Sequence, residues 1–208
     1  MTGFTRDKWL DRIRARPDLT AYLTHLTRRA MVGDRDLDGL DVLIRILRER
    51  RLKGTDPATG LIFGTTPAVC LFDVPLHSIV QDLVRGGEAH GGHRGYDPFG
   101  LSFPKPYLFR LGARPVVYDR AGDAGKYLPE DQHWRIVHYD LHDERNLIDP
   151  THEREWRVPG SFEFEIAEAV ILLPNGKVQR DFARRSAAGG EDVAPLVRAV
   201  VPLNSAVL

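Results

Sequence analysis

The chain has 208 residues, of which 42% are hydrophobic and 28% are charged, and its 29 basic residues balance 29 acidic residues. This length supports one sizeable core, and the zero net charge argues against a polybasic membrane protein or a dedicated nucleic-acid coat protein. The single cysteine, Cys70, excludes an intrachain disulfide and a cysteine-rich metal site. No window is apolar enough to span a bilayer, so we expect a cytoplasmic protein without a membrane partner.

Helices and strands alternate in the first part of the chain. Apolar residues recur at helical spacing between charged ones in residues 5–16 and 38–51, and residues 77–84 are also compatible with a helix. Gly54 is the expected stop of the second helix. Runs rich in β-branched and other apolar residues predict strands at 19–27 and 68–72.

The second part of the chain predicts short strands and long loops. Residues 86–95 are rich in glycine and indicate a surface loop, which lacks the Gly-Lys-Ser/Thr ending of a phosphate-binding loop. Residues 119–149 are polar and irregular, and Pro174-Asn175-Gly176 is typical of a turn. The predicted strands of this part are 100–103, 115–118, 153–158, 161–166 and 168–173.

These elements together predict a single α+β domain over residues 1–208. It would comprise an amino-terminal helix in residues 1–18, a core in residues 19–175 and a carboxy-terminal extension in residues 176–208. We expect a split, strongly twisted mixed sheet of short strands with a central cleft.

The segment His152-Glu153-Arg154-Glu155-Trp156-Arg157-Val158 is the most informative for chemistry. If it opens a strand, Glu153 and Glu155 are two residues apart and project to the same face, where both acids reach one cleft. A carboxylate pair at a strand mouth can hold a sugar hydroxyl and face a developing cation. The alternative interpretation is an exposed strand face with cross-strand ion pairs.

Four blocks of the sequence form a recognisable series. They are Val69-Cys70-Leu71-Phe72-Asp73-Val74-Pro75-Leu76, Tyr96 through Lys105, Ala113-Arg114-Pro115-Val116-Val117-Tyr118 and Glu153-Arg154-Glu155-Trp156-Arg157. Taken in order, these blocks resemble the AbiGi-type abortive-infection family. The resemblance covers about residues 20–175, and it departs from the family pattern at Asp97-Pro98-Phe99 and at Pro104 in the second block. It implies a role in bacterial defence against phage, with a cognate toxin or antitoxin as partner.

A more distant likeness concerns the first predicted strand. The segment Tyr22-Leu23-Thr24-His25-Leu26-Thr27, followed by a helix and Gly54, looks like the opening of DarT-type ADP-ribosyltransferase toxins. This resemblance implies an ADP-ribosyltransferase-like fold with NAD as substrate. It also implies that His25 and Thr27 hold the nicotinamide ribose, while Glu153 and Glu155 supply the late Glu-x-Glu pair.

The residue types suit the cleavage of a nicotinamide glycosidic bond. This reaction passes through an oxocarbenium-like species, which a carboxylate that binds the ribose hydroxyl stabilises. We assign this role to Glu155, and we expect Glu153 to orient or deprotonate the incoming nucleophile. His25 would donate a hydrogen bond to the ribose.

The remaining candidates are side chains for the nicotinamide ring and the diphosphate. Phe72 and Tyr118 could stack near the ring, although both are also ordinary core aromatic residues. A diphosphate favours arginine in bidentate geometry, for which Arg157 and Arg28 are the candidates.

Two other functions compete with this one. His138 and His142 are four residues apart beside several acids, a spacing that on a helix would suit a metal-dependent nuclease. The chain could instead be a non-catalytic antitoxin or sensor that binds a partner protein or a nucleotide. The sequence leaves open whether the acceptor is a nucleic acid or a protein.

Overall fold

The computed structural model describes residues 3–81 and 97–206, and the chain forms two compact units. The predicted glycine-rich loop at 86–95 and the end of the helix predicted at 77–84 lie outside the described residues. The first unit comprises Met1–Arg50, Val74–Pro104 and Phe164–Leu208, and the second comprises Arg51–Asp73 and Lys105–Glu163.

Four strands of the first unit pair with one another in both antiparallel and parallel directions. β1 pairs antiparallel with β6, β6 pairs antiparallel with β12, and β12 pairs parallel with β13. The fully buried side chains of Leu23, Leu101 and Ile171 place the core on these strands. The strands are β1 (Tyr22–Leu26), β6 (Gly100–Pro104), β12 (Val170–Leu173) and β13 (Ala199–Pro202).

The helix predicted at 38–51 is α2 (Gly39–Glu49), and its start follows from the sequence. The Asp38 carboxylate accepts a hydrogen bond from the Asp41 backbone N–H at 2.8 Å, which caps the helix. Leucine and isoleucine side chains on one face of α2 are buried. The helix ends where Arg50 adopts a left-handed conformation with φ of 49°, so Gly54 is not its stop.

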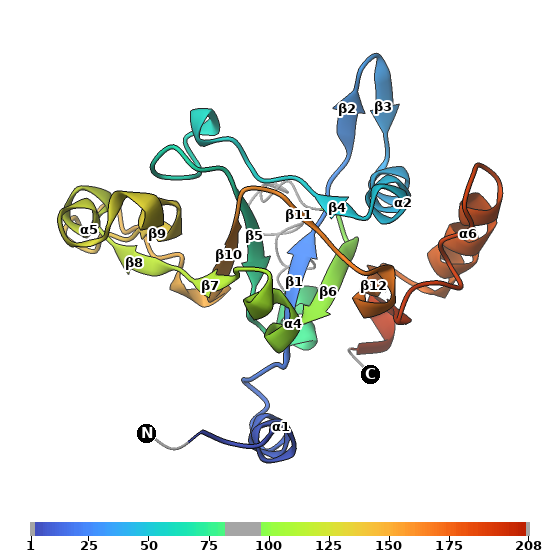
Figure 1. The fold of residues 1–208 in the computed structure, drawn as a ribbon, viewed down its shortest axis with the longest axis horizontal. Helices are drawn as coiled ribbons and strands as arrows, with labels where there is room; N and C mark the ends of the chain where they lie inside the picture. Colours follow the sequence, from blue (N-terminus) through green and yellow to red (C-terminus); the bar gives the residue numbers. More distant parts are fainter. Residues whose placement is uncertain (1–2, 82–96, 207–208) are drawn as a thin grey trace. The chain divides into compact units, whose positions relative to one another are not determined.

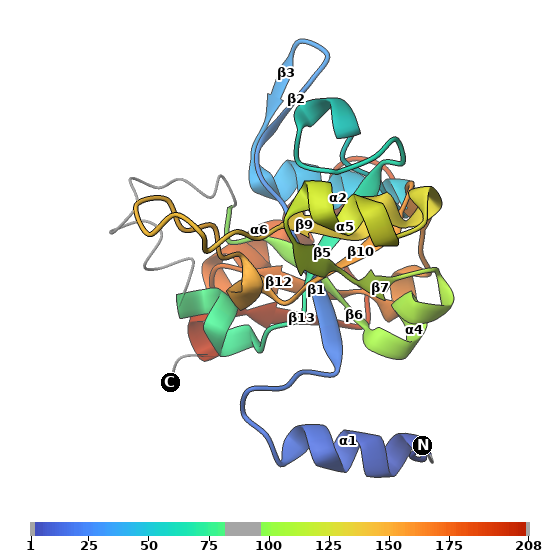
Figure 2. The same cartoon turned by 90° about the vertical axis from the view of Figure 1, so that its left-hand side faces the viewer.

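Two further elements of the first unit precede α2. The predicted amino-terminal helix is α1 (Arg6–Arg14), capped by Thr5, and it has no buried residue. The sequence did not predict the hairpin of β2 (Ala30–Val32) and β3 (Arg35–Leu37), which Figure 1 and Figure 2 show extending beyond α2.

The segment predicted as a closing turn begins a helix instead. The side chain of Asn175 accepts hydrogen bonds from the N–H groups of Lys177 and Val178, at 3.0 and 3.1 Å, and so caps α6 (Gly176–Ala187). Phe182 is the buried anchor of this helix. Residues 176–206 therefore contribute a helix and the strand β13 to the first unit.

The second unit contains three short groups of strands. β10 lies between β5 and β7 with antiparallel pairing to both, β8 pairs parallel with β9, and β4 pairs antiparallel with β11. Figure 1 shows the helix α5 (Ala121–Tyr127) beside β8 and β9. The strands are β4 (Arg51–Leu52), β5 (Ala68–Phe72), β7 (Arg114–Pro115), β8 (Val117–Asp119), β9 (Ile136–His138), β10 (Glu155–Pro159) and β11 (Phe162–Glu163).

Short helices complete the second unit and shorten the predicted strands. The region 119–149, expected to be irregular, contains α5 and a 3₁₀ helix, η2. The strand predicted at 115–118 is divided at Val116 between β7 and β8. The other short helices described are η1 (Pro57–Thr59), α4 (Lys105–Arg110), η2 (Glu130–Arg135) and η3 (Thr151–Glu153), with η4 (Ile166–Glu168) and η5 (Leu203–Ala206) in the first unit.

The predicted class is confirmed, because helices and short strands alternate in an α+β fold with mixed strand pairing. The division of residues 1–208 into helix, core and extension, and the central cleft, stay predictions. Within residues 3–81 and 97–206, every helix is too short or too polar to cross a membrane.

Candidate functional site

The two acids of the Glu-x-Glu pair do not both lie on a strand, so that prediction is wrong. Glu153 ends the 3₁₀ helix η3, Arg154 adopts a left-handed conformation with φ of 47°, and β10 begins only at Glu155. The turn is closed by a hydrogen bond from the Arg154 N–H to the Thr151 carbonyl at 3.1 Å. Strand alternation therefore does not fix the direction of Glu153 relative to Glu155.

Glu155 forms a buried ion pair with Arg157, two residues further along the same face of β10. The Arg157 Nε lies 2.8 Å from one carboxylate oxygen and Nη2 lies 3.3 Å from the other. Glu155 is 7% exposed and Arg157 is 3% exposed. The pair is thus a fork of two hydrogen bonds that is shielded from water.

The other donors of Arg157 are also engaged inside the second unit. Nη1 donates to the carbonyls of Trp134 and Ile136 at 2.8 and 3.1 Å, and Nη2 donates to the Leu61 carbonyl at 3.4 Å. All five N–H groups of the guanidinium therefore have acceptors. The role of Arg157 as a diphosphate ligand stays a prediction, and it would require some of these bonds to open.

Tyr118 contacts Glu155 through its hydroxyl group. The hydroxyl oxygen accepts a hydrogen bond from the Glu155 backbone N–H at 2.7 Å. Burial, together with the nearby carboxylates, raises the pKa of Tyr118 to about 12 although the backbone bond opposes the shift. The side chain therefore keeps its proton at neutral pH. Stacking of its ring on nicotinamide stays a prediction.

Phe72 and Cys70 lie opposite the ion pair on the neighbouring strand β5. Phe72 is in register with Glu155, and Cys70 is in register with Arg157. Burial and the adjacent Glu155 raise the pKa of the Cys70 thiol to about 12, although Arg157 opposes the shift. The thiol is therefore poorly reactive in the folded protein. The role of Phe72 as a ring-stacking residue stays a prediction.

Two residues that we did not single out from the sequence complete this group. Asp73, 8% exposed, forms an ion pair with Lys105 across 2.6 Å, and its second oxygen accepts a hydrogen bond from the indole of Trp156 at 3.2 Å. Asp73 belongs to the first of the four sequence blocks and Lys105 to the second. Because both residues lie in these blocks, the sequence alone could have marked them as candidate site residues.

His25 and Thr27 belong to the first unit, at the end of β1. His25 is half-buried within the strand, and Thr27 is buried directly after it. The Thr27 N–H donates to the Phe99 carbonyl at 2.8 Å, and its hydroxyl donates to the same oxygen at 3.4 Å. Glu153 and Glu155 belong to the second unit. The convergence of these two groups on one ligand stays a prediction, as does Arg28, which is exposed.

The histidines of the metal hypothesis do not share a helix. His138 ends β9, where its Nδ1 accepts a hydrogen bond from the Ala121 N–H at 3.3 Å, and His142 lies at a bend further along the chain. Across residues 3–81 and 97–206, no three His, Cys, Asp or Glu side chains are grouped as a metal site would need. The helical arrangement on which the nuclease alternative depends is therefore wrong.

Comparisons with known proteins identify one similar structure. No family model matches the chain, and no curated protein matches it. Among solved structures, the chain is similar to that of Thermus sp. 2.9 DarT in complex with NAD+, with a TM-score of 0.44 and 14% identity over 88% of this chain and 96% of that chain. A similarity of this size carries no information on activity.

Proposed function

We propose that the protein is an NAD-dependent ADP-ribosyltransferase of a bacterial anti-phage or toxin-antitoxin system in the cytoplasm. The observation that supports it is Glu155, a carboxylate at the first position of a strand, fixed by Arg157 through two hydrogen bonds. The resemblances of residues 22–27 and 153–157 to DarT-type toxins, together with the four blocks, add NAD and phage defence to this proposal.

The chemistry requires a carboxylate beside the ribose. The bond between ribose C1′ and the nicotinamide nitrogen breaks, nicotinamide leaves with the bonding electrons, and the ribose becomes an oxocarbenium ion. Glu155 would hold a ribose hydroxyl and stabilise this cation. The acceptor then bonds to C1′, and its proton passes to Glu153. His25 and Thr27 stay our proposed ribose ligands, and Phe72 and Tyr118 stay our proposed neighbours of the nicotinamide ring.

Arg157 has a supporting part in this proposal. Because its guanidinium is bonded on all sides, it holds the Glu155 carboxylate in one rotamer before the substrate arrives. Preorganisation of this kind is what makes a charged group effective in a transition state.

The test is a nicotinamide-release assay together with calorimetric titration of NAD. The variant Glu155→Gln should lower the release rate by about 100-fold or more, because the amide lacks the charge that stabilises the cation. Glu168→Gln is a matched control, since Glu168 also accepts a bond from an arginine, Arg198, at 2.8 Å but is more exposed. The proposal would be refuted if the protein did not bind NAD at millimolar concentration, or if Glu155→Gln released nicotinamide at the wild-type rate.

The burial of Glu155 supports a second candidate function. A carboxylate that is 7% exposed and bonded by a buried arginine also suits a purely structural ion pair. The chain would then be a non-catalytic antitoxin or sensor that keeps the fold and binds a partner protein or a nucleotide. In that case Glu155→Gln would lower stability, and the wild-type protein would release no nicotinamide.

A further inference from the structure

Asp73 contacts both chain neighbours of Glu155. Its backbone N–H donates to the Arg154 carbonyl at 3.2 Å, and its Oδ1 lies 3.8 Å from the Arg154 guanidinium. Its Oδ2 accepts the indole N–H of Trp156 at 3.2 Å. One residue directly after β5 therefore contacts the residues immediately before and after Glu155.

Lys105 supplies the charge that lets Asp73 be buried. Its ammonium lies 2.6 Å from Asp73 Oδ1, and the two side chains are 16% and 11% exposed. Within the described residues this oxygen has no partner in hydrogen-bond geometry, so the ionic contact with Lys105 compensates its burial. Removal of Lys105 would leave the Asp73 carboxylate with only the more distant Arg154 guanidinium, 3.8 Å away, as a counter-charge.

The backbone directly before Glu155 has an unusual conformation, because Arg154 is left-handed. Arg154 is one of two non-glycine residues with positive φ in the described part of the chain, the other being Arg50. A left-handed arginine persists only where its surroundings hold it. The bond from the Asp73 N–H to the Arg154 carbonyl is one such restraint.

We propose that Asp73 and Lys105 form a positioning pair that holds the corner Arg154-Glu155-Trp156 and thereby sets the Glu155 carboxylate against Arg157. The pair acts through the neighbours of Glu155 and need not touch a ligand. Its effect on geometry is independent of the activity, whereas its effect on catalysis rests on the proposed function.

The reactivity of Cys70 can report on the position of the ion pair between Glu155 and Arg157. Cys70 is the only cysteine in the sequence, and it lies in register with Arg157 beside the ion pair. Its thiol has a pKa raised to about 12, chiefly by burial, so the native protein should react slowly with a thiol reagent. A shift of Glu155 and Arg157 would uncover the thiol without requiring any turnover.

The first experiment measures the reaction of Cys70 with a disulfide reagent at pH 8 in native buffer. Asp73→Asn and Lys105→Met should each raise the rate about 10-fold or more, because the corner loosens. Asp123→Asn is the matched control, since Lys126 and Asp123 are also 2.6 Å apart but 76% and 49% exposed. This control should leave the rate unchanged. Lys105→Arg keeps the positive charge, so its Cys70 should react at a rate closer to that of the wild-type protein than to that of Lys105→Met.

The second experiment measures nicotinamide release by the same variants. Asp73→Asn should lower kcat about 10- to 100-fold and change KM for NAD by less than about 3-fold, since misplacement of the reacting carboxylate affects the chemical step. If Asp73→Asn does not fold, Trp156→Phe removes the same indole bond from the other side. Unfolding curves of all variants show whether the altered rates come from the folded state.

The results separate this inference from the proposed function. A wild-type protein without nicotinamide release, together with a Cys70 that Asp73→Asn exposes, refutes the activity and supports the positioning pair. Unchanged Cys70 reactivity in folded Asp73→Asn and Lys105→Met overturns the positioning pair, whatever the activity. An equal effect of Asp123→Asn would also overturn it, because burial would then have no part.

Discussion

Arg157 donates to both carboxylate oxygens of Glu155, at 2.8 Å from Nε and 3.3 Å from Nη2, across one face of β10. The bond geometry follows from their spacing, because residues two apart on a strand project to the same side. Both side chains are buried, so the pair is shielded from water.

Arg157→Met should be strongly destabilising. It leaves the buried Glu155 carboxylate without a counter-charge and removes the donors from the Trp134 and Ile136 carbonyls. We expect a loss of about 3 to 5 kcal/mol in the free energy of unfolding, measured by urea denaturation. The double variant with Glu155→Gln should lose less than the sum of the single losses. Additive losses would show that the two side chains do not stabilise each other.

Alkaline pH should destabilise the protein through Cys70 and Tyr118. Both pKa values are raised to about 12 in the fold, chiefly by burial. A raised pKa means that the stabilising contribution is complete below the unfolded pKa, about 8.5 for cysteine, and is lost as pH rises toward the folded value. Cys70→Ala should therefore flatten the fall in unfolding free energy between pH 8 and 10. An unchanged slope would contradict the buried state of this thiol.

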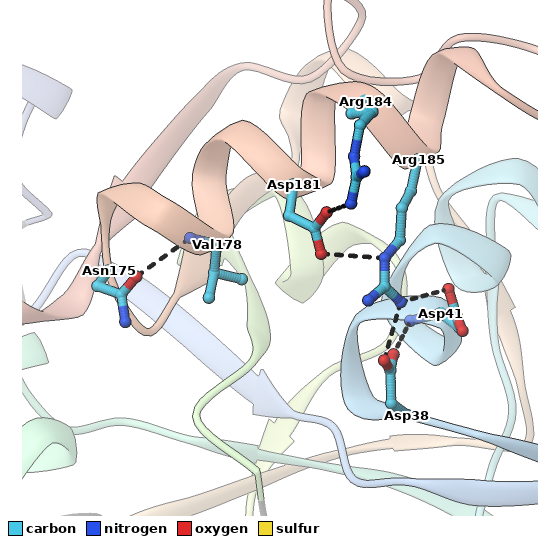
Figure 3. Close-up of polar contacts among 7 residues, drawn as sticks. All are labelled: Asp38, Asp41, Asn175, Val178, Asp181, Arg184 and Arg185. Atoms are coloured by element: carbon cyan, nitrogen blue, oxygen red, sulfur yellow. Dashed lines mark hydrogen bonds and ion pairs between the residues drawn. The ribbon is translucent and has the colours of Figure 1, made fainter.

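Arg185 should connect two helices of the first unit. Figure 3 shows its guanidinium between Asp181 of α6 and the acids Asp38 and Asp41 at the start of α2. The ion-pair distances to Asp181, Asp38 and Asp41 are 3.0, 2.8 and 3.0 Å. Because the network is partly exposed, Arg185→Met should lower the unfolding free energy by about 1 kcal/mol at low salt and by less at 1 M salt. Arg184→Met, on the same helix, should have a smaller effect. Equal effects would contradict a specific role of Arg185.

The same network should weaken in acid. Burial tends to raise the pKa of Asp38, but the Asp41 backbone N–H and Arg185 outweigh this effect and lower it. A lowered pKa means that the contribution of Asp38 is present above its unfolded pKa, about 3.9, and is lost as pH falls through the folded value. Arg185→Met should therefore narrow the difference in stability between pH 6 and pH 3. A difference as large as that of the wild-type protein would contradict this coupling.

Gly54→Ala should be poorly tolerated in the second unit. A Cβ at Gly54 would lie 2.1 Å from the Gly160 carbonyl oxygen, which is backbone and has little room to move. We expect a loss of about 2 kcal/mol or more by thermal or urea denaturation. Gly122→Ala is the control, because a Cβ there meets nothing within 4 Å and the residue lies in α5. It should be neutral or slightly stabilising.

The sequence by itself determined the elements whose signals are local. The helix α2 follows from apolar residues at helical spacing after a capping aspartate, and β5 follows from a short apolar run. The α+β class follows from their alternation. Residues 153–157 could also be selected as a candidate site from the spacing of Glu153 and Glu155, and that functional role stays a prediction.

Only the tertiary structure decided how that segment is used. The alternating pattern predicted that Glu153 lies on a strand. In the structure, Glu153 belongs to the 3₁₀ helix η3 and Arg154 is left-handed, so β10 begins only at Glu155. Asn175 looked like part of a turn, and whether its side chain caps a helix depends on what the following face can bury, here Phe182. Likewise, the pairing of Asp73 with Lys105 joins residues that are distant in the chain. Contacts between distant parts of the chain decide whether a charged side chain is buried and which partner it has. A local sequence pattern does not encode them.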